Sequence, residues 1–351
     1  MKKIEAQIVA DSISPQGHRI TSFLLTYPRF IHGEIMTHRM FSRNSASSRA
    51  IPVENMLRMV EEDPFIPIAW QKAHKGMQGT EYFTEDKTIH ALQTDWLRAR
   101  DKAVEYATYL NEREVTKQLC NRLLEPFMWH TVLVTATDWE NFFELRCPQY
   151  YFEPSNKYFR SKKDFVKEWS ATFKVGLDIP NEASVDSWSF EQWQERFNHS
   201  QAEIHIQALA ESLWDAMNDS TPKELKAGGW HIPFGDRIDG NLLVYNSENT
   251  QIGNIENINK LKIQIATARC ARLSYMTFDG EIDYEKDIKL HDRLLKEGHF
   301  SPFEHCARAM NDDEYYLFSK GMDGQKSHEQ GWCNNYRGWV QYRYLIENNH
   351  E

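Results

Sequence analysis

The sequence lacks any long apolar run. Nowhere in its 351 residues does a stretch approach the roughly 18 consecutive apolar residues that a membrane-spanning helix requires. Charged residues interrupt the first ten positions, MKKIEAQIVA, where a signal peptide would be apolar. We therefore expect a cytoplasmic protein that does not associate with a membrane.

Cysteine and positive charge are both scarce. The five cysteines are odd in number and never form a C-x-x-C pair, so we expect reduced thiols rather than a disulfide framework or a zinc knuckle. Only 41 Lys and Arg stand against 51 Asp and Glu, which gives a net charge of −10. General binding of nucleic acid through phosphate neutralisation is therefore not expected. An anionic ligand would need a local basic pocket.

The composition is that of a globular protein, with 41% hydrophobic and 13% aromatic residues. The spacing of apolar residues predicts an α+β fold that is helix-rich with a central antiparallel sheet. The length allows one large domain or two modest ones. We expect a single domain over residues 1–351 with an insertion at 147–197, where no period is clear. Strands are predicted at Ile4–Val9, His18–Tyr27 and Thr131–Ala136, and helices at Pro28–His38, Gln201–Met217, Ile258–Ser274 and Tyr284–Glu297. Thr84–Cys120 is predicted to form one long amphipathic helix or two.

A further helix is predicted just after the third strand. Thr137 and Glu140 have the spacing of a T-x-x-E capping box, which predicts that Thr137 begins this helix. We expect Arg146 to end it.

The most unusual segment is THRMFSRNSASSRAIP, from Thr37 to Pro52. It contains three arginines, four serines and one asparagine. Serine hydroxyls and successive backbone N–H groups in a tight loop can form an anion nest, and arginine adds bidentate bonds to phosphate. This chemistry indicates a bound phosphate, whereas composition alone is equally compatible with a solvated loop.

The spacing within this segment resembles the signature of the flavin-dependent thymidylate synthases. The pattern H-R-x-x-S-x-N-x-x-S-x-R is filled by His38, Arg39, Ser42, Asn44, Ser47 and Arg49. Two positions differ from the usual family sequence, because Thr37 stands in place of an arginine and Glu34 in place of a glutamine.

A second block is also similar to that family. ARCARLSY (Ala268–Tyr275) and EGHFSPFEH (Glu297–His305) match segments that precede the arginine motif in the family, whereas here they follow it by more than 200 residues. The order resembles a circular permutation, which a fold can accept because chain ends usually lie at the surface and close together. With Asn111–Arg146 and His199–Ala210, the resemblance covers about half of the chain.

The resemblance implies the family's fold and activity. In that activity the methylene of methylenetetrahydrofolate is transferred to C5 of dUMP, and FAD that NADPH has reduced supplies the hydride, which gives dTMP. No cysteine nucleophile is needed. The resemblance also implies a homotetramer whose sites draw residues from several subunits.

The resemblance further implies roles for single residues. Catalytic roles fall to His299, Arg146 and Ser47, with Arg146 reading the pyrimidine ring and His299 near the flavin and the base. The flavin contacts are His38, Arg39, Asn141, Ser301 and Glu304, and the nucleotide contacts are Glu34, Ser47, Ser48, Arg49, Arg122 and Arg146. The last nucleotide-contacting arginine is left open, because its matching position is Lys117 with Arg122 close behind, and we favour Arg122.

Several alternatives compete with these assignments. His291, His299 and His305 could instead bind a metal, but no H-x-x-x-H pair accompanies them, so we expect no metal. Cys147-Pro148 is reminiscent of the cysteine-dependent synthases, but the flanking sequence of those enzymes is missing. Glu34 and Thr37 also leave open another pyrimidine nucleotide, such as dCMP for methylation or hydroxymethylation, and a nucleotide-binding homologue without catalysis.

Overall fold

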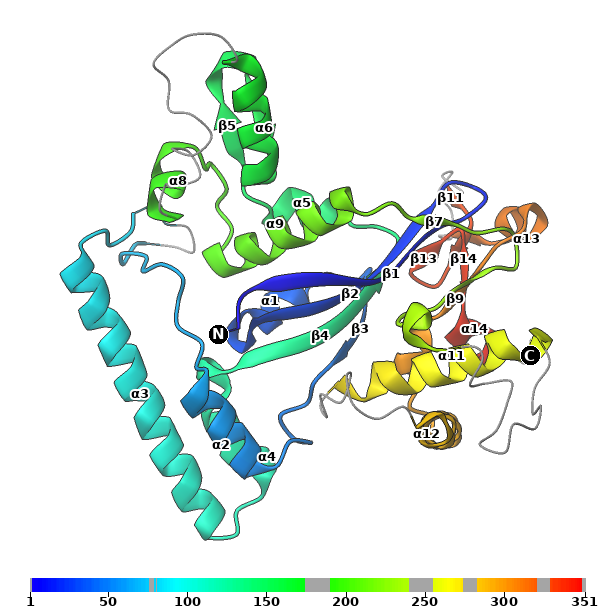
Figure 1. Cartoon of the computed structure of the whole chain (residues 1–351), viewed down its shortest axis with the longest axis horizontal. Helices are drawn as coiled ribbons and strands as arrows, with labels where there is room; N and C mark the ends of the chain where they lie inside the picture. The colour runs from blue at the N-terminus through cyan, green and yellow to red at the C-terminus, as the bar shows by residue number, and fades with distance from the viewer. Residues whose placement is uncertain are drawn as a thin grey trace.

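A five-stranded sheet runs through the middle of the molecule (Figure 1). The computed structural model describes residues 2–75, 79, 81–173, 190–239, 255–273, 283–320 and 329–348. The strand order is β3-β4-β2-β1-β7, and all neighbours are antiparallel except β7, which pairs in parallel with β1 over two residues. The predicted α+β class is confirmed, and the sheet is mixed only at this edge. Its strands are β1 (Glu5–Ile13), β2 (Arg19–Pro28), β3 (Ser42–Ser45), β4 (Trp129–Ala136) and β7 (Lys223–Glu224).

The predicted strand pair at the amino end is confirmed. β1 and β2 form a hairpin whose turn contains Gly17 with a φ of 82°, a left-handed conformation that glycine adopts without strain. Beside the turn, Arg19 donates two hydrogen bonds to the carboxylate of Asp11, at 2.9 and 2.6 Å. The hairpin and β4 together form the part of the sheet in which neighbouring strands pair over the longest stretches.

The two faces of the sheet pack against different parts of the chain. Because side chains alternate along a strand, Phe23 and Leu25 point to one face and Leu24 to the other. The first face is covered by the short α1 and by two longer helices, whereas Leu24 and Leu133 pack with Phe234 and with Leu273. The helices of the first face are α1 (His32–Ile35), α5 (Glu140–Arg146) and α9 (Ile204–Asp219).

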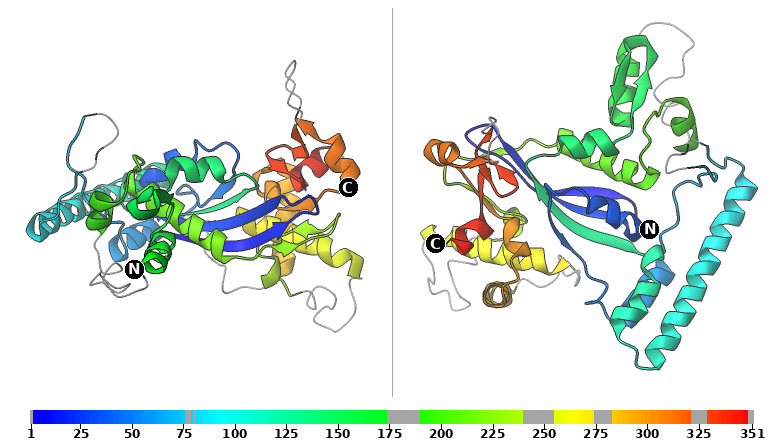
Figure 2. Two further views of the ribbon diagram at one scale, coloured as in Figure 1. Left: turned by 90° about the horizontal axis from the view of Figure 1, so that it is seen from above. Right: turned by 180° about the vertical axis from the view of Figure 1, so that it is seen from behind.

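A long helix lies at the margin of the molecule, away from the sheet, in all three views of Figures 1 and 2. This helix, α3 (Asp86–Glu112), packs on α2 (Val53–Glu62) through Met56 and Ala107. Of the one helix or two predicted over 84–120, the structure has two, because Glu114 takes a φ of 60° and Thr116 caps a new helix. That new turn is α4 (Lys117–Cys120), followed by the 3₁₀ turns η2 (Asn121–Leu123) and η3 (Glu125–Phe127).

The segment predicted as an insertion has an aromatic cluster of its own. Tyr150, Phe152, Phe165 and Trp193 are buried together, and the β5–α6 unit stands apart from the sheet in Figure 1. Arg160 ties it to α5 by ion pairs to Glu140 and Glu144. Its described elements are β5 (Tyr150–Phe152), η4 (Glu153–Ser155), β6 (Lys157–Phe159), α6 (Lys162–Thr172) and α8 (Phe190–Arg196).

The carboxyl-terminal third packs on the second face of the sheet. A three-stranded antiparallel sheet, in the order β14-β9-β8, lies beside the predicted helix at Tyr284–Glu297, which is confirmed to the residue. Its elements are β8 (Trp230–His231), η5 (Gly235–Arg237), α11 (Ile255–Ala271), α12 (Tyr284–Glu297), η7 (Ser301–Glu304), β9 (Ala307–Ala309), α13 (Asp312–Leu317), β10 (Ser319–Lys320), β11 (Glu329–Gln330), β12 (Trp332–Cys333), β13 (Tyr336–Arg337), β14 (Trp339–Gln341) and α14 (Tyr342–Glu347).

Three local predictions are wrong. The chain stays extended through Pro28 and then forms only η1 (Arg29–Ile31) and the four-residue α1, so there is no helix through His38. The Ser-rich loop contains β3, which pairs with β4. Thr137 does not cap α5, because its hydroxyl accepts a hydrogen bond from the backbone N–H of Arg337 at 3.0 Å, and Trp139 occupies the N-cap position.

Two more findings bear on the expectations from the sequence. No helix among the described residues is long and apolar enough to cross a membrane. The N and C marks lie on different sides of the molecule in Figures 1 and 2.

Burial of His130 on β4 predicts a pH-dependent stability. Burial, Arg29 and His32 lower the pKa of His130 to about 2, and its Nε2 accepts a hydrogen bond from Arg29 Nη1 at 3.1 Å. The unfolded chain therefore binds a proton below about pH 6.5 that the folded chain does not bind. The free energy of unfolding contributed by this neutral imidazole should fall by up to about 1.4 kcal/mol per pH unit as pH decreases from 6 to 4.

A His130→Gln variant is the matched control, because its amide oxygen can accept from Arg29 but cannot be protonated. Urea denaturation at several pH values measures the difference in unfolding free energy between the two proteins. A difference that stays constant between pH 6 and 4 would contradict the assignment.

Candidate functional site

A half-open pocket lies between the turn after α1 and the start of α5. It has a volume of about 270 Å³. Three of the predicted flavin contacts, His38, Arg39 and Asn141, line it. The remaining walls come from Thr37, Met40, Phe41, Asp138 and Phe142. The pocket therefore combines a cation, an amide and an imidazole with an aromatic floor.

His38 is the buried member of this group. Its ring meets Phe142 edge-on at 4.9 Å and stacks against Phe41 at 5.6 Å. Burial, followed by the charges of Arg146 and Arg43, lowers the pKa of His38 to about 4. At neutral pH the imidazole is uncharged, and its Nε2 accepts a hydrogen bond from Arg146 Nε at 3.3 Å.

Arg146 ends α5, as the sequence predicts, and lies between two partners. Besides the bond to His38, its Nη1 is 4.0 Å from Glu34 Oε2 on α1. Burial, followed by the neighbouring Glu203, raises the pKa of Glu34. The guanidinium is 24% exposed, so it is oriented by the protein and still accessible to a planar ligand.

The two motif segments meet within one chain. Asn44 on β3 contacts His305 at the end of η7, with a distance of 3.2 Å between the Asn44 side-chain amide and His305 Nε2, although 261 positions separate them. Glu304 of η7 binds Arg343 at 2.8 Å and also faces the charge of Arg43. The junction between β3 and η7 therefore joins the arginine motif to the Pro-Phe-Glu-His motif.

Arg43 links this junction to the pocket. Its Nη1 donates to the backbone carbonyls of Ile35, Met36 and His38 at 3.3, 2.9 and 3.2 Å. These carbonyls lie at and just beyond the end of α1, where those of Ile35 and His38 also accept from the backbone N–H groups of His38 and Phe41 at 3.3 Å. The arginine thus fixes the turn that carries His38.

The predicted nucleotide-binding turn at Ser47–Arg49 is hydrogen-bonded to the segment from α4 to η3. Ser48 donates its hydroxyl to Glu125 at 2.7 Å, and Asn121 donates to the carbonyls of Ser48 and Ile51 at 2.7 and 2.9 Å. Lys117 Nζ donates to the carbonyl of Ala50 at 3.2 Å. The loop is therefore preformed.

Two of the predicted arginines are exposed. The side chains of Arg49 and Arg122 lie at the surface, and Arg49 donates its backbone N–H to Ser47 Oγ at 3.3 Å. Of the two candidates for the last nucleotide contact, Lys117 is the one whose side chain touches the loop. The sequence did not single out Asn121 or Glu125, although both lie within Asn111–Arg146, because their contacts to the Ser48 turn come from a segment more than 70 positions away.

His299 and Ser301 lie apart from the pocket. His299 follows Gly298 at the end of α12, is 66% exposed and pairs with Glu297 at 3.6 Å. The exposed Ser301 begins η7 and reaches the junction through its backbone carbonyl. A single chain therefore gathers His38, Arg39, Asn141 and Arg146 and leaves His299 on an open surface.

Two of the alternatives weighed from the sequence were a cysteine nucleophile and a metal site. Cys147 is buried, and burial raises the pKa of its thiol, which opposes a role as nucleophile. No group of three or more His, Cys, Asp or Glu that could hold a metal ion occurs in the described part of the chain.

The contact between Arg146 and His38 predicts a measurable change in the pKa of His38. In an Arg146→Gln variant one positive neighbour is lost, so the pKa of His38 should rise from about 4 but stay below 6.5, because burial is the larger cause. NMR titration of the imidazole measures it. Arg39→Gln is the control and should leave the pKa unchanged. An equal rise in the pKa of His38 in both variants would contradict the contact between Arg146 and His38.

No protein-family model matches this sequence, and no curated protein matches it. Two solved structures that resemble the chain are crystal structures of the UMP/dUMP methylase PolB from Streptomyces cacaoi, bound with 5-Br dUMP or with 5-Br UMP. The first likeness has 15% identity and a TM-score of 0.32 and covers 44% of this chain and 67% of that chain. The second has 15% identity and a TM-score of 0.35 and covers 49% and 91%. At these TM-scores the likeness assigns neither site residues nor an activity to this chain.

Proposed function

We propose that this protein is a flavin-dependent thymidylate synthase with a permuted motif order, which methylates dUMP at C5. One observation carries the proposal. The arginine motif and the Pro-Phe-Glu-His motif, 261 positions apart at their point of contact, pack together at the junction of β3 and η7. A chance resemblance of two short motifs gives no reason for them to meet.

The residues of the pocket suit one end of a flavin. Arg39 offers an exposed charge and Asn141 an amide, and the neutral His38 can donate from Nδ1 because Nε2 is occupied. At about 270 Å³ the pocket is smaller than the roughly 300–1,000 Å³ of ordinary small-molecule sites. A whole FAD would extend beyond it, and we propose that further subunits of a homotetramer cover the remainder.

The protein's own contribution is binding and orientation. Reduced FAD, when bound, would supply the hydride, and methylenetetrahydrofolate and NADPH would supply the carbon and the reducing power. Arg146 would hold a pyrimidine carbonyl with its planar fork, oriented by His38 and Glu34. Arg49 and the backbone of the Ser47–Ser48 turn would hold the phosphate, with Glu125 and Asn121 keeping the turn in shape.

The decisive experiment is an assay on the purified protein. We expect a yellow protein whose flavin NADPH reduces, and thymidylate formation from dUMP with methylenetetrahydrofolate. A colourless protein that takes up no flavin when FAD is added would end this proposal. A protein that binds flavin and nucleotide without turnover would point to the non-catalytic homologue.

Arg146→Lys tests the role of the planar guanidinium. Lysine keeps the charge but loses the fork, so kcat/KM for dUMP should fall by about 10²-fold, the equivalent of one or two charged hydrogen bonds. Arg98→Lys on α3, an exposed arginine paired with Asp95 at 3.1 Å, is the matched control and should behave like the unchanged enzyme. Equal kinetics in the two variants would remove Arg146 from the site.

A second candidate is the same chemistry on dCMP, which the position of Glu34 favours. Its carboxyl lies 4.0 Å from the pyrimidine-reading Arg146, and a carboxylate accepts a bond from an exocyclic amine. Proton release from C5 of dUMP and of dCMP distinguishes the two. If dCMP is the substrate, Glu34→Gln should shift the preference towards dUMP, because an amide both donates and accepts. Inactivity on both nucleotides would reject both versions.

A further inference from the structure

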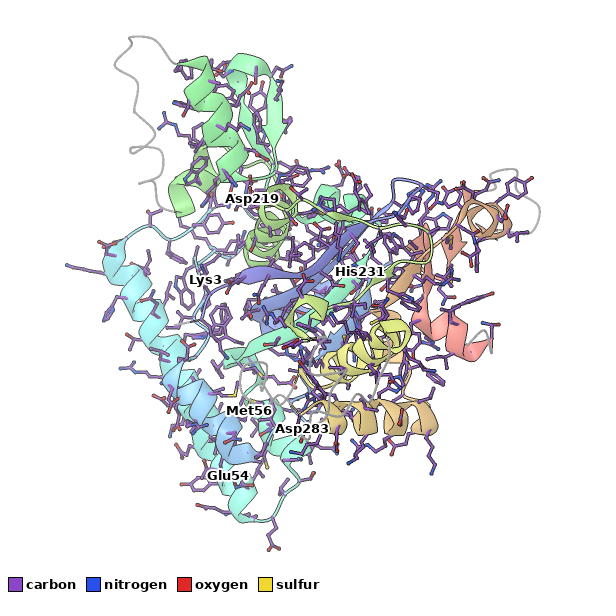
Figure 3. All side chains as sticks on the ribbon, turned by 45° about the vertical axis from the view of Figure 1, so that its right-hand side comes forward. Lys3, Glu54, Met56, Asp219, His231 and Asp283 are labelled. Atoms are coloured by element: carbon purple, nitrogen blue, oxygen red, sulfur yellow. The ribbon has the colours of Figure 1, made fainter. Side chains whose placement is uncertain are left out.

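A chain of buried polar side chains crosses the central sheet and connects it to the carboxyl-terminal third. It contains one residue from each of β1, β2, β3 and β4, one histidine from β8 and one histidine that follows η7. His231, labelled in Figure 3, lies against the sheet from β8. The members, in spatial order, are Asn44, His305, Thr135, Ser22, His231 and Ser12.

The polar atoms of each neighbouring pair in this chain lie within hydrogen-bonding distance of each other. His305 Nδ1 is 2.8 Å from Thr135 Oγ1, which is 2.6 Å from Ser22 Oγ. Ser22 Oγ is 2.9 Å from His231 Nε2, and His231 Nδ1 is 3.0 Å from Ser12 Oγ. Four of these residues, His305, Thr135, Ser22 and His231, have no exposed surface. Water therefore cannot substitute for a missing partner.

The surroundings of Asn44 decide which nitrogen of His305 carries the proton. With the amide nitrogen facing His305, it lies 3.0 Å from the Arg43 carbonyl oxygen, 3.2 Å from the Ser301 carbonyl oxygen and 3.2 Å from His305 Nε2. In the opposite orientation the amide oxygen would face two carbonyl oxygens. Since an N–H group faces His305 Nε2, that nitrogen is bare, and the proton of the neutral ring sits on Nδ1.

This orientation sets the direction of the whole chain. His305 Nδ1–H donates to Thr135, so the Thr135 hydroxyl donates to Ser22. The Ser22 hydroxyl then donates to His231 Nε2, which leaves the proton of His231 on Nδ1, donating to Ser12. Burial keeps both rings neutral, because it lowers the pKa of His231 and of His305 to about 3. One amide orientation thus specifies two tautomers.

We propose that this chain is a positioning network that fixes the Asn44 amide and, through it, holds η7 against β3. Thr135, Ser22 and His231 are then positioning residues, although none of them lines the pocket. Asn44 is the point where the network reaches the two motifs, through the carbonyls of Arg43 and Ser301. A buried network of this kind specifies a single arrangement only while every member is satisfied.

The first test is a measurement of the two tautomers in the full-length protein. Ring nitrogens are labelled at histidine only, and NMR signals are assigned with His231→Gln and His305→Gln variants. We expect the proton on Nδ1 and a bare Nε2 at both positions. A proton on Nε2 of His305 overturns the proposal, and this result requires neither substrate nor flavin.

The second test uses a matched pair of substitutions at Thr135. Thr135→Val keeps the side-chain shape and removes the hydroxyl, whereas Thr135→Ser keeps the hydroxyl. The valine variant should lose the single-tautomer pattern at His231, which is linked to His305 only through the Thr135 and Ser22 hydroxyls, and the serine variant should retain it. Wild-type signals in the valine variant would overturn the proposal. If the valine variant does not fold, the wild-type tautomers and the serine variant still decide.

The third test rests on the proposed function, since Ser301 and Glu304 of η7 are proposed flavin contacts. FAD affinity should fall by about tenfold in Thr135→Val, the effect of one lost buried hydrogen bond, and stay near the wild-type value in Thr135→Ser. Unchanged affinity in the valine variant would remove the positioning role while leaving the proposed function intact. If the wild-type protein binds no flavin, the proposed function fails and the tautomers still decide on the network.

Discussion

The structure depends on a chain of hydrogen-bonded polar side chains between the central sheet and the carboxyl-terminal third. An apolar face alone would let these two parts slide, because hydrophobic contact has no direction. The link from Asn44 through Thr135 to His231 has both direction and spacing. It therefore allows only one alignment, and that alignment brings η7 to β3.

The charges around the pocket are positioned by this alignment of β3 and η7. Arg43 lies on β3 beside Asn44, and its guanidinium fixes the turn that carries His38. His38 in turn accepts a hydrogen bond from Arg146, so a neutral imidazole orients the arginine. The charge of Arg146 is balanced only in part by Glu34, 4.0 Å away, and stays available for a ligand. A protein with a net charge of −10 thus has a partly exposed cation beside this pocket.

Local sequence signals predict an element correctly where no distant part of the chain competes for the same backbone or side-chain groups. The helix at Tyr284–Glu297 is confirmed to the residue, because Asp283 caps its start and Gly298 takes a φ of 74° at its end. The capping box at Thr137 failed, because a distant backbone N–H, that of Arg337, takes the hydroxyl. The Ser-rich segment failed as a loop for the same kind of reason, since β4 offers Ser42–Ser45 a strand to pair with. Partners from far along the chain overrode the local preference.

The sequence by itself determined the α+β class, the hairpin, the long helices and the residue types of the candidate site, because periodicity and motif spacing are properties of neighbouring residues. Only the tertiary structure decided which of those residues meet. It joined Asn44 to His305 and Arg146 to His38, and it left His299 exposed at the end of α12. It also showed Glu125 and Asn121 supporting the Ser48 turn. These contacts depend on the register of strands and on which face of the sheet each segment covers, and no local pattern encodes them.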